Sequence, residues 1–310
     1  MADNPISYGG QAVMEGVLMR GKKAYAMAVR RPDGGIELID KPISTKANAK
    51  FFKLPLIRGF VALCSSMALG YSALSQSAEI ALADEVEPTS KLEKFLVDKL
   101  GEKLNGILMT CAMVVSVAMG IGLFLLLPTF LASLLNVPGT LRGVVEGLVR
   151  VFIFVGYIVI ISRLKDIQRV FGYHGAEHKA IDCYEKKMPL TTENVASCNR
   201  LHKRCGTSFM LVVMVVTMIL FMIIRIDDIW LRFASRIALL PVIAGISYEI
   251  SVKWAGSRDN LLVRAIIAPG MLIQRLTTRE PDEGQIEIAV AALEKAVAQE
   301  YEPEPHNDDN

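Results

Sequence analysis

ILMTCAMVVSVAMGIGLFLLL, residues 107–127, decides the fold class of this chain. It belongs to a stretch from Lys103 to Arg142 that carries no charge between its ends, and residues 206–224 (GTSFMLVVMVVTMILFMII) form a second uncharged run. An α-helix of roughly 20 apolar residues is long enough to cross the hydrocarbon core of a bilayer. Each run therefore predicts a membrane-spanning helix, with Pro128 near the far end of the first.

Two further segments are apolar but interrupted by charge. Residues 151–161 (VFIFVGYIVII) become long enough to span only together with Arg150 and Glu146, and residues 237–248 only together with Glu249. A charge inside a span is costly unless it faces protein or water. We therefore expect these two helices to lie inside the bundle, and Glu249 becomes a candidate site residue. The predicted fold class is mainly α, a polytopic membrane helix bundle with about four spans.

Composition and charge distribution agree with a membrane protein. Hydrophobic residues make up 52% of the 310 residues and the mean hydropathy is +0.37, which is too apolar for a pair of average soluble domains. Lysines and arginines gather before residue 107 and between residues 163 and 205, whereas the 128–140 connection has no charge. Because basic segments remain in the cytoplasm, we expect both termini and the 163–206 loop on that side. Residues 1–25 show no cleavable signal peptide.

The segments outside the spans predict smaller elements. Residues 24–31 and 36–43 flank a Pro-Asp-Gly-Gly turn and predict a β-hairpin, with residues 9–21 as a strand packed against it. Residues 59–78 are uncharged but rich in serine, and they predict an amphipathic or re-entrant helix. The expected organisation is a cytoplasmic β-rich region 1–55, amphipathic or re-entrant and cytoplasmic helices 56–106, a membrane bundle 107–255, an interfacial helix 256–280 interrupted at Pro269-Gly270, and a C-terminal helix with a disordered acidic tail 281–310.

Three of the four histidines lie in the cytoplasmic loop, two of them in the sequence HGAEH. On a helix, residues i, i+3 and i+4 share a face, so His174, Glu177 and His178 are expected to project together. This H-x-x-E-H order is that of inverted zincins, in which two imidazoles hold zinc and the glutamate is the general base. The candidate metal ligands are therefore His174 and His178, with Glu177 as the candidate catalytic residue.

The second half of the loop carries further candidate ligands. Thr191 or Thr192 is expected to cap a helix from Glu193 to Leu201, and Cys198, His202 and Cys205 follow at i, i+4 and i+7. Three interpretations remain open. The histidines lie at lipid headgroups without a metal, or Cys198 and Cys205 close a structural zinc site with two histidines, or the site is open and catalytic, with Glu177 and Glu249 as acids that a closed site does not need.

Four motifs resemble the YqhQ-like family of bacterial multi-pass membrane proteins. They are GGQAVMEGVLMRG (9–21), FGYHGAEHKAI (171–181), HKRCGTSF (202–209) and PVIAGISYEI (241–250), within a likeness that extends over about residues 8 to 285. The members of this family are described as predicted metal-dependent enzymes. The resemblance therefore implies a metal-dependent, multi-pass protein of the bacterial plasma membrane. Carried over residue by residue, it points to the set His174, Glu177, His178, His202 and Cys205, with Glu15 and Glu249 as outlying acids.

Two classes of function follow from these features. In the first, the protein is a zinc-dependent hydrolase or peptidase with His202 or Glu249 as the third ligand, and it acts on a membrane peptide or lipid-linked substrate at the cytoplasmic face. In the second, it is a scaffold or membrane-biogenesis factor whose basic cytoplasmic surface binds anionic lipid or a soluble partner such as the ribosome at the translocon. A transporter is a weaker third interpretation, because no inverted repeat is visible.

Overall fold

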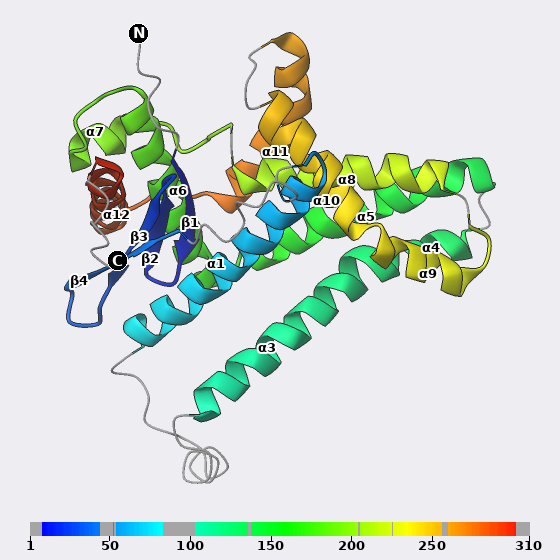
Figure 1. The fold of residues 1–310 in the computed structure, drawn as a ribbon, viewed down its shortest axis with the longest axis horizontal. Helices are drawn as coiled ribbons and strands as arrows, with labels where there is room; N and C mark the ends of the chain where they lie inside the picture. The colour runs from blue at the N-terminus through cyan, green and yellow to red at the C-terminus, as the bar shows by residue number, and fades with distance from the viewer. Residues whose placement is uncertain are drawn as a thin grey trace, which may run out of the picture.

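The computed structural model describes residues 8–43, 52, 54–82, 103–135, 138–203, 205–224, 226–255 and 260–301. The chain is mainly helical, with a small antiparallel sheet near its N-terminus. In Figure 1 the sheet and the helices packed on it lie at one end of the molecule, and a bundle of long helices extends away from them. The predicted acidic tail and the predicted helices of residues 83–102 lie outside the described residues.

The sheet is a meander of four strands in the order β1 (Gly9–Val13), β2 (Gly16–Arg20), β3 (Ala24–Arg30) and β4 (Ile36–Pro42). The predicted hairpin at residues 24–43 is confirmed as β3 and β4. The prediction of one strand at residues 9–21 is wrong, because the chain turns back at Met14-Glu15 to form two paired strands. Glu15 has a positive φ of 50°, and the glycine that follows it packs tightly on the backbone of β3. Glutamate is not among the residue types that favour turns, so the sequence pattern did not predict a turn at Glu15.

The two central strands of this sheet, β2 and β3, are covered on both faces. On one face, alternate residues such as Val17 and Met19 join a core with α6 (Lys165–Glu185), α7 (Thr192–Ser197) and α12 (Glu283–Tyr301). On the other face, Leu18 and Met27 pack with Ala73 of α1 (Ile57–Ala81). Successive side chains of a strand point to opposite faces, which explains why β2 is continuously apolar. The sheet and the C-terminal helix α12 therefore share one core, although they stand at opposite ends of the chain.

The helices of the bundle follow from the apolar runs. They are α3 (Lys103–Ile121), the π-helical turn η3 (Gly122–Leu126), α4 (Leu127–Leu134), α5 (Gly139–Ile161), α8 (Gly206–Ile223), α9 (Ile229–Ala238), α10 (Leu240–Tyr248), the π-helical turn η4 (Glu249–Ala255) and α11 (Leu261–Thr277). The expectation that the first span ends near Pro128 is wrong. The helix continues without a break to Leu134. A π-helical turn precedes Pro128, and the carbonyl of Phe124, four residues before this proline, accepts a hydrogen bond from Arg150 instead.

Within the described residues, four helices are long and apolar enough to cross a membrane, and a fifth span results if the bent pair α9–α10 counts as one. Three of the four match predicted spans and have a hydropathy of 2.4, whereas α1 has a hydropathy of only 1.3. The predicted span at residues 237–248 is the second half of a pair bent by 43°. Residues 59–78 form an unbroken helix, so the re-entrant alternative is wrong. The break expected at Pro269-Gly270 is also absent, because α11 continues through Pro269.

The charged residues predicted to face the bundle interior do so. Glu146 is 1% exposed and Arg150 is 4% exposed, and both lie on the face of α5 turned toward α4 and α9. The opposite face of α5 is exposed at Leu148 and Phe152. Helix α5 therefore turns one face toward the bundle interior and exposes the other. It is less buried than the sequence predicted, since the whole helix was expected to lie inside the bundle.

Candidate metal centre

Helix α6 places the three residues of the HGAEH motif on one face. His174 and His178 are one turn apart, and their ring centroids are 4.4 Å apart. Glu177 lies between them along the helix and is buried, with 5% of its surface exposed. The predicted i, i+3, i+4 arrangement is therefore present, on a helix that packs against the sheet and α12.

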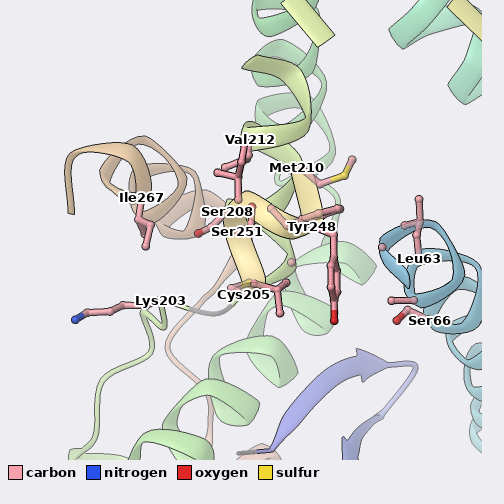
Figure 2. A pocket seen from close by; sticks show the side chains of 16 residues that line it. Leu63, Ser66, Lys203, Cys205, Ser208, Met210, Val212, Tyr248, Ser251 and Ile267 are labelled. Atoms are coloured by element: carbon pink, nitrogen blue, oxygen red, sulfur yellow. The ribbon is translucent and has the colours of Figure 1, made fainter. Parts of the chain in front are cut away.

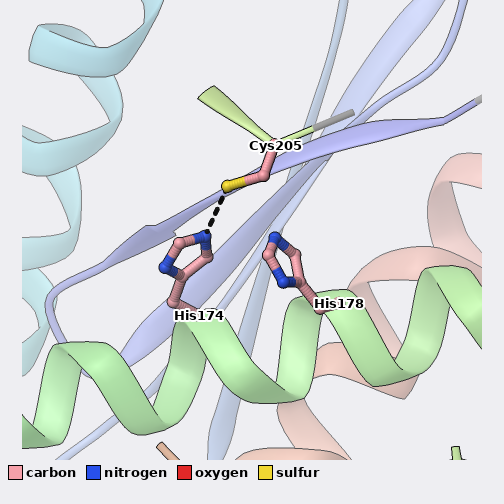
Figure 3. Close-up of side chains that lie close together, drawn as sticks. All are labelled: His174, His178 and Cys205. Carbon is pink, nitrogen blue, oxygen red and sulfur yellow. Dashed lines mark hydrogen bonds between the residues drawn. The ribbon is translucent and has the colours of Figure 1, made fainter. Parts of the chain in front are cut away.

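Cys205 reaches this face from a distant part of the chain. It is the N-cap residue of α8, and its Sγ lies 3.3 Å from Nε2 of His174 (Figure 3). His174, His178 and Cys205 each offer one ligand atom, and these three atoms lie within 4.8 Å of one another. In a tetrahedral zinc site with Zn–N and Zn–S bonds of about 2.1 and 2.3 Å, neighbouring N and S ligands are about 3.5 Å apart. The observed sulfur–nitrogen distance fits that spacing.

The helix predicted for residues 193–201 is shorter than expected. Thr191 caps α7 by accepting from the backbone N–H of Asn194, as predicted, but α7 ends at Ser197. Cys198, His202 and Cys205 therefore do not share a helix face. Cys198 instead turns into the core beside Cys183. A closed zinc site that includes Cys198 is not formed.

Two backbone carbonyls hold the imidazole rings. The carbonyl of Thr277 lies 2.8 Å from Nδ1 of His174, and the carbonyl of Arg200 lies 2.6 Å from Nδ1 of His178. A carbonyl oxygen only accepts hydrogen bonds, so each Nδ1 carries a proton, and in the neutral ring the lone pair lies on Nε2. Hydrogen bonds of this kind orient metal-binding histidines in proteins. Both rings are therefore prepared to bind a cation through Nε2.

Burial controls the protonation of the cluster. Burial lowers the pKa of His178 to about 3, with a further decrease from neighbouring His174, so this imidazole is neutral at physiological pH. Burial also raises the pKa of the Cys205 thiol. Without a bound cation the thiol is therefore protonated, whereas a divalent metal favours the thiolate.

Glu177 is enclosed by the sheet. A side chain at Gly10 of β1 would place its Cβ 2.6 Å from Cγ of Glu177, so this glycine allows the strand to lie against the carboxylate. Burial raises the pKa of Glu177 to about 8, although the charge of His174 opposes the shift. In metal-free protein the side chain is therefore largely protonated at neutral pH, and the charge of a bound cation would favour the carboxylate form.

The structure places the other candidate residues outside the group of three. His202 is adjacent, with its ring centroid 5.9 Å from that of His178, but its Nε2 is 3.3 Å from Glu185. Glu249 lies at the start of η4 and forms a two-point ion pair with Arg58 of α1.

Glu15 is also engaged elsewhere. Its carboxylate accepts hydrogen bonds from Arg169 and Tyr173 of α6. These contacts attach the β1–β2 turn to the helix that carries the histidines. Glu15 therefore helps to hold the sheet in place over α6.

An apolar pocket of about 700 Å³ adjoins Cys205 (Figure 2). Its walls come from α1, α8, the α10–η4 junction and α11. Carbon atoms dominate the wall, and the polar side chains on it include Ser66, Lys203, Ser208, Tyr248 and Ser251. The pocket therefore brings an apolar chamber to one side of the cluster.

Sequence reasoning missed three components of this centre, which are Gly10 and the carbonyls of Arg200 and Thr277. Each acts through a contact between distant segments, and a backbone carbonyl leaves no side-chain signal in a sequence. Gly175 gave a weak signal, as a glycine within a helix. A Cβ there would lie 2.0 Å from the carbonyl oxygen of Arg279, so the glycine lets the segment that supplies the Thr277 carbonyl pass close to α6.

Comparisons with known proteins agree with the motifs. The family model described as "Protein of unknown function (DUF1385)" matches residues 54–299. "Uncharacterized protein YqhQ" of Bacillus subtilis (strain 168) is 36% identical over 318 residues, an alignment that covers 98% of this chain and 98% of the relative. No solved structure matches the chain. With a family model over most of its length and this relative along nearly all of it, the chain belongs to the DUF1385, YqhQ-like family.

Proposed function

We propose that this protein is a zinc-dependent hydrolase of the bacterial plasma membrane, with His174, His178 and Cys205 as the metal ligands. The observation that carries the proposal is the convergence of three donor atoms, two of them on imidazoles that backbone carbonyls already hold in the metal-binding tautomer. Three protein ligands leave a fourth position open, as in catalytic rather than structural zinc sites. Zinc in such a position supplies a Lewis acid and an activated water.

Glu177 is the proposed general base. It lies on the same helix face as the two histidines, and the sheet shields it from bulk solvent. His202 is close enough to take part in substrate binding, whereas Glu249 is paired with Arg58 and is not proposed as a ligand.

The proposed substrate is a membrane peptide or a lipid-linked molecule. The pocket beside Cys205 is lined mainly by apolar side chains and reaches from α1 to α11. An apolar chamber next to a hydrolytic centre suits a substrate that brings a hydrophobic chain with it, because burial of that chain gains about 25 cal/mol per Å² of apolar surface.

The proposed membrane placement uses α3–α4, α5, α8 and α9–α10 as spans, with the sheet and the metal centre on the cytoplasmic side. Helix α1 is assigned to the boundary between bundle and sheet. Its first turns approach α10 closely at Gly59 and Gly245, its second half packs on the sheet, and its hydropathy is the lowest of the four candidates. This arrangement keeps both described ends of the chain on the side of the sheet.

Metal analysis of two matched cysteine variants tests the proposal. We expect purified wild-type protein and Cys198→Ser to contain about one zinc per chain, and Cys205→Ser and His174→Ala/His178→Ala to contain little. Cys198 is a suitable control because it is buried nearby in the same irregular segment but lies in the core. Equal metal content in the two cysteine variants, or no metal in the wild type, contradicts the proposed site.

Complementation of a deletion strain separates the hydrolase from the scaffold alternative. The hydrolase predicts that Glu177→Gln fails to complement while the protein accumulates normally. If Glu177→Gln complements fully and substitutions of exposed lysines and arginines in the 163–206 loop do not, the function is binding of an anionic lipid or a soluble partner such as the ribosome.

A further inference from the structure

A second polar site lies at the end of the bundle far from the sheet. In Figure 1, α4 and α9 lie at this end, alongside the far ends of α5 and α8. A pocket of about 170 Å³ is formed there, with Arg142, Arg232 and Arg236 in its wall together with Phe221 and Asp227. Cys205 and Ile224 cap the two ends of α8, whose 18 residues span roughly 27 Å at 1.5 Å per residue. The pocket is therefore remote from the candidate metal centre.

The two buried arginines of this pocket, Arg232 and Arg236, lack matching negative charge. Arg236 is 3% exposed and binds Glu146 through Nε and Nη2, at 3.2 and 3.1 Å. Arg150 uses the same carboxylate, with Nη2 3.0 Å from Oε1. Two guanidinium groups thus share one acid. The Nη1 atoms of Arg236 and Arg150 are buried and have no hydrogen-bond partner.

The remaining arginines add positive charge to the wall. Arg232 is 3% exposed and donates to the backbone carbonyls of Ile226 and Asp227, which orient it but supply no full counter-charge. Nη1 of Arg142 is 3.7 Å from the carboxylate of Asp227, whose side chain is fully exposed, and the buried Nε of Arg142 has no partner. Among the described residues the pocket wall therefore holds three cations and one solvated carboxylate.

A buried charge is costly unless a partner of opposite sign and hydrogen bonds compensate it. We propose that this pocket binds an oxyanion, a phosphate or phosphate monoester or diester group, through Arg142, Arg232 and Arg236. The planar fork of a guanidinium suits the oxygens of phosphate. A molecule of liquid water occupies about 30 Å³. The pocket of about 170 Å³ has the volume of several water molecules and therefore has room for a phosphate group.

The phosphate has two possible sources, a free anion or the headgroup of a lipid. The exposed side chains Trp230 and Leu231 on α9 present an apolar surface next to the pocket, and tryptophan is enriched where membrane meets water. Either source offers the same oxygens to the arginines, so the ligand class is the same and the measurement distinguishes the sources.

The test is titration calorimetry of full-length protein in neutral detergent. Inorganic phosphate is one titrant, and mixed micelles with phosphatidylglycerol are the second, compared with diacylglycerol, which lacks the phosphate. We expect Arg142→Gln to weaken binding by about tenfold, the effect of losing one charge-assisted hydrogen bond. Arg142 is chosen because Arg236 supports the buried Glu146 and its replacement endangers folding. Arg275→Gln is the matched control, an exposed arginine on α11 and outside the 163–206 loop.

Saturable binding of phosphate that Arg142→Gln weakens and Arg275→Gln does not supports the site with a free anion as its ligand. The same pattern with phosphatidylglycerol alone supports the site with a lipid headgroup as its ligand. Binding of neither titrant, equal binding of diacylglycerol, or equal loss in the two variants overturns the proposal.

Discussion

The contact between Gly10 and Glu177 allows a quantitative test of how the sheet positions the candidate base. A Cβ at residue 10 would lie 2.6 Å from Cγ and 2.7 Å from Cδ and Oε1 of Glu177, whereas ordinary contacts begin at 3.4 Å. The overlap of about 0.8 Å cannot be relieved by moving the carboxylate tip alone, because Cγ is also involved. Overpacking of this kind costs about 1–3 kcal/mol. We therefore expect Gly10→Ala to lower the free energy of unfolding by that amount.

Gly9→Ala is the matched control, because a Cβ at Gly9 meets no atom within 4 Å. A substitution in such an open position changes the free energy of unfolding by at most about 0.5 kcal/mol. The measurement is chemical denaturation of detergent-solubilised protein followed by circular dichroism. Zinc content is measured in parallel and should remain at the wild-type value, since neither glycine contacts the three proposed ligands, while activity or complementation by Gly10→Ala falls.

A double-mutant cycle identifies the cause of the destabilisation. In a Glu177→Ala background the overlapping atoms are gone, so Gly10→Ala should cost little there. If Gly10→Ala is as costly in that background as in the wild type, or no more costly than Gly9→Ala, the reasoning is refuted and Gly10 does not act through Glu177.

Two further predictions concern the same helix. Gly175→Ala should destabilise the protein and reduce its zinc content, because its Cβ would meet the Arg279 carbonyl at 2.0 Å and displace the segment that holds His174. Metal analysis and chemical denaturation measure the two effects. A variant with wild-type zinc content and wild-type stability contradicts this prediction. In metal-free protein, burial keeps the pKa of His178 at about 3, below its ordinary value of 6.5, so the unfolded state binds the proton more readily and acid favours unfolding. The contribution of His178 should be fully present above pH 6.5 and decrease by up to about 1.4 kcal/mol per pH unit as the pH falls toward 3. The difference in stability between wild type and His178→Gln, measured over this pH range in chelator, isolates the effect, and a pH-independent difference argues against a buried neutral imidazole.

Local sequence patterns determined much of this protein. Three long apolar runs, the β3–β4 hairpin and the shared face of His174, Glu177 and His178 depend on hydropathy, turn chemistry and the 3.6-residue period, which act over a few neighbouring residues. The interior position of Glu146 and Arg150 also followed from the sequence, because a charge on a predicted span is costly unless it faces protein or water.

Only the tertiary structure decided which distant residues meet. The path of the irregular segment after α7 brings Cys205 to His174, turns Cys198 into the core and leaves His202 beside Glu185. The packing of α1 on α10 pairs Glu249 with Arg58, and the approach of β1 to α6 makes Gly10 part of the site. Each of these contacts joins segments that are not neighbours in the chain, so it depends on how the whole fold packs rather than on any local pattern of residue types.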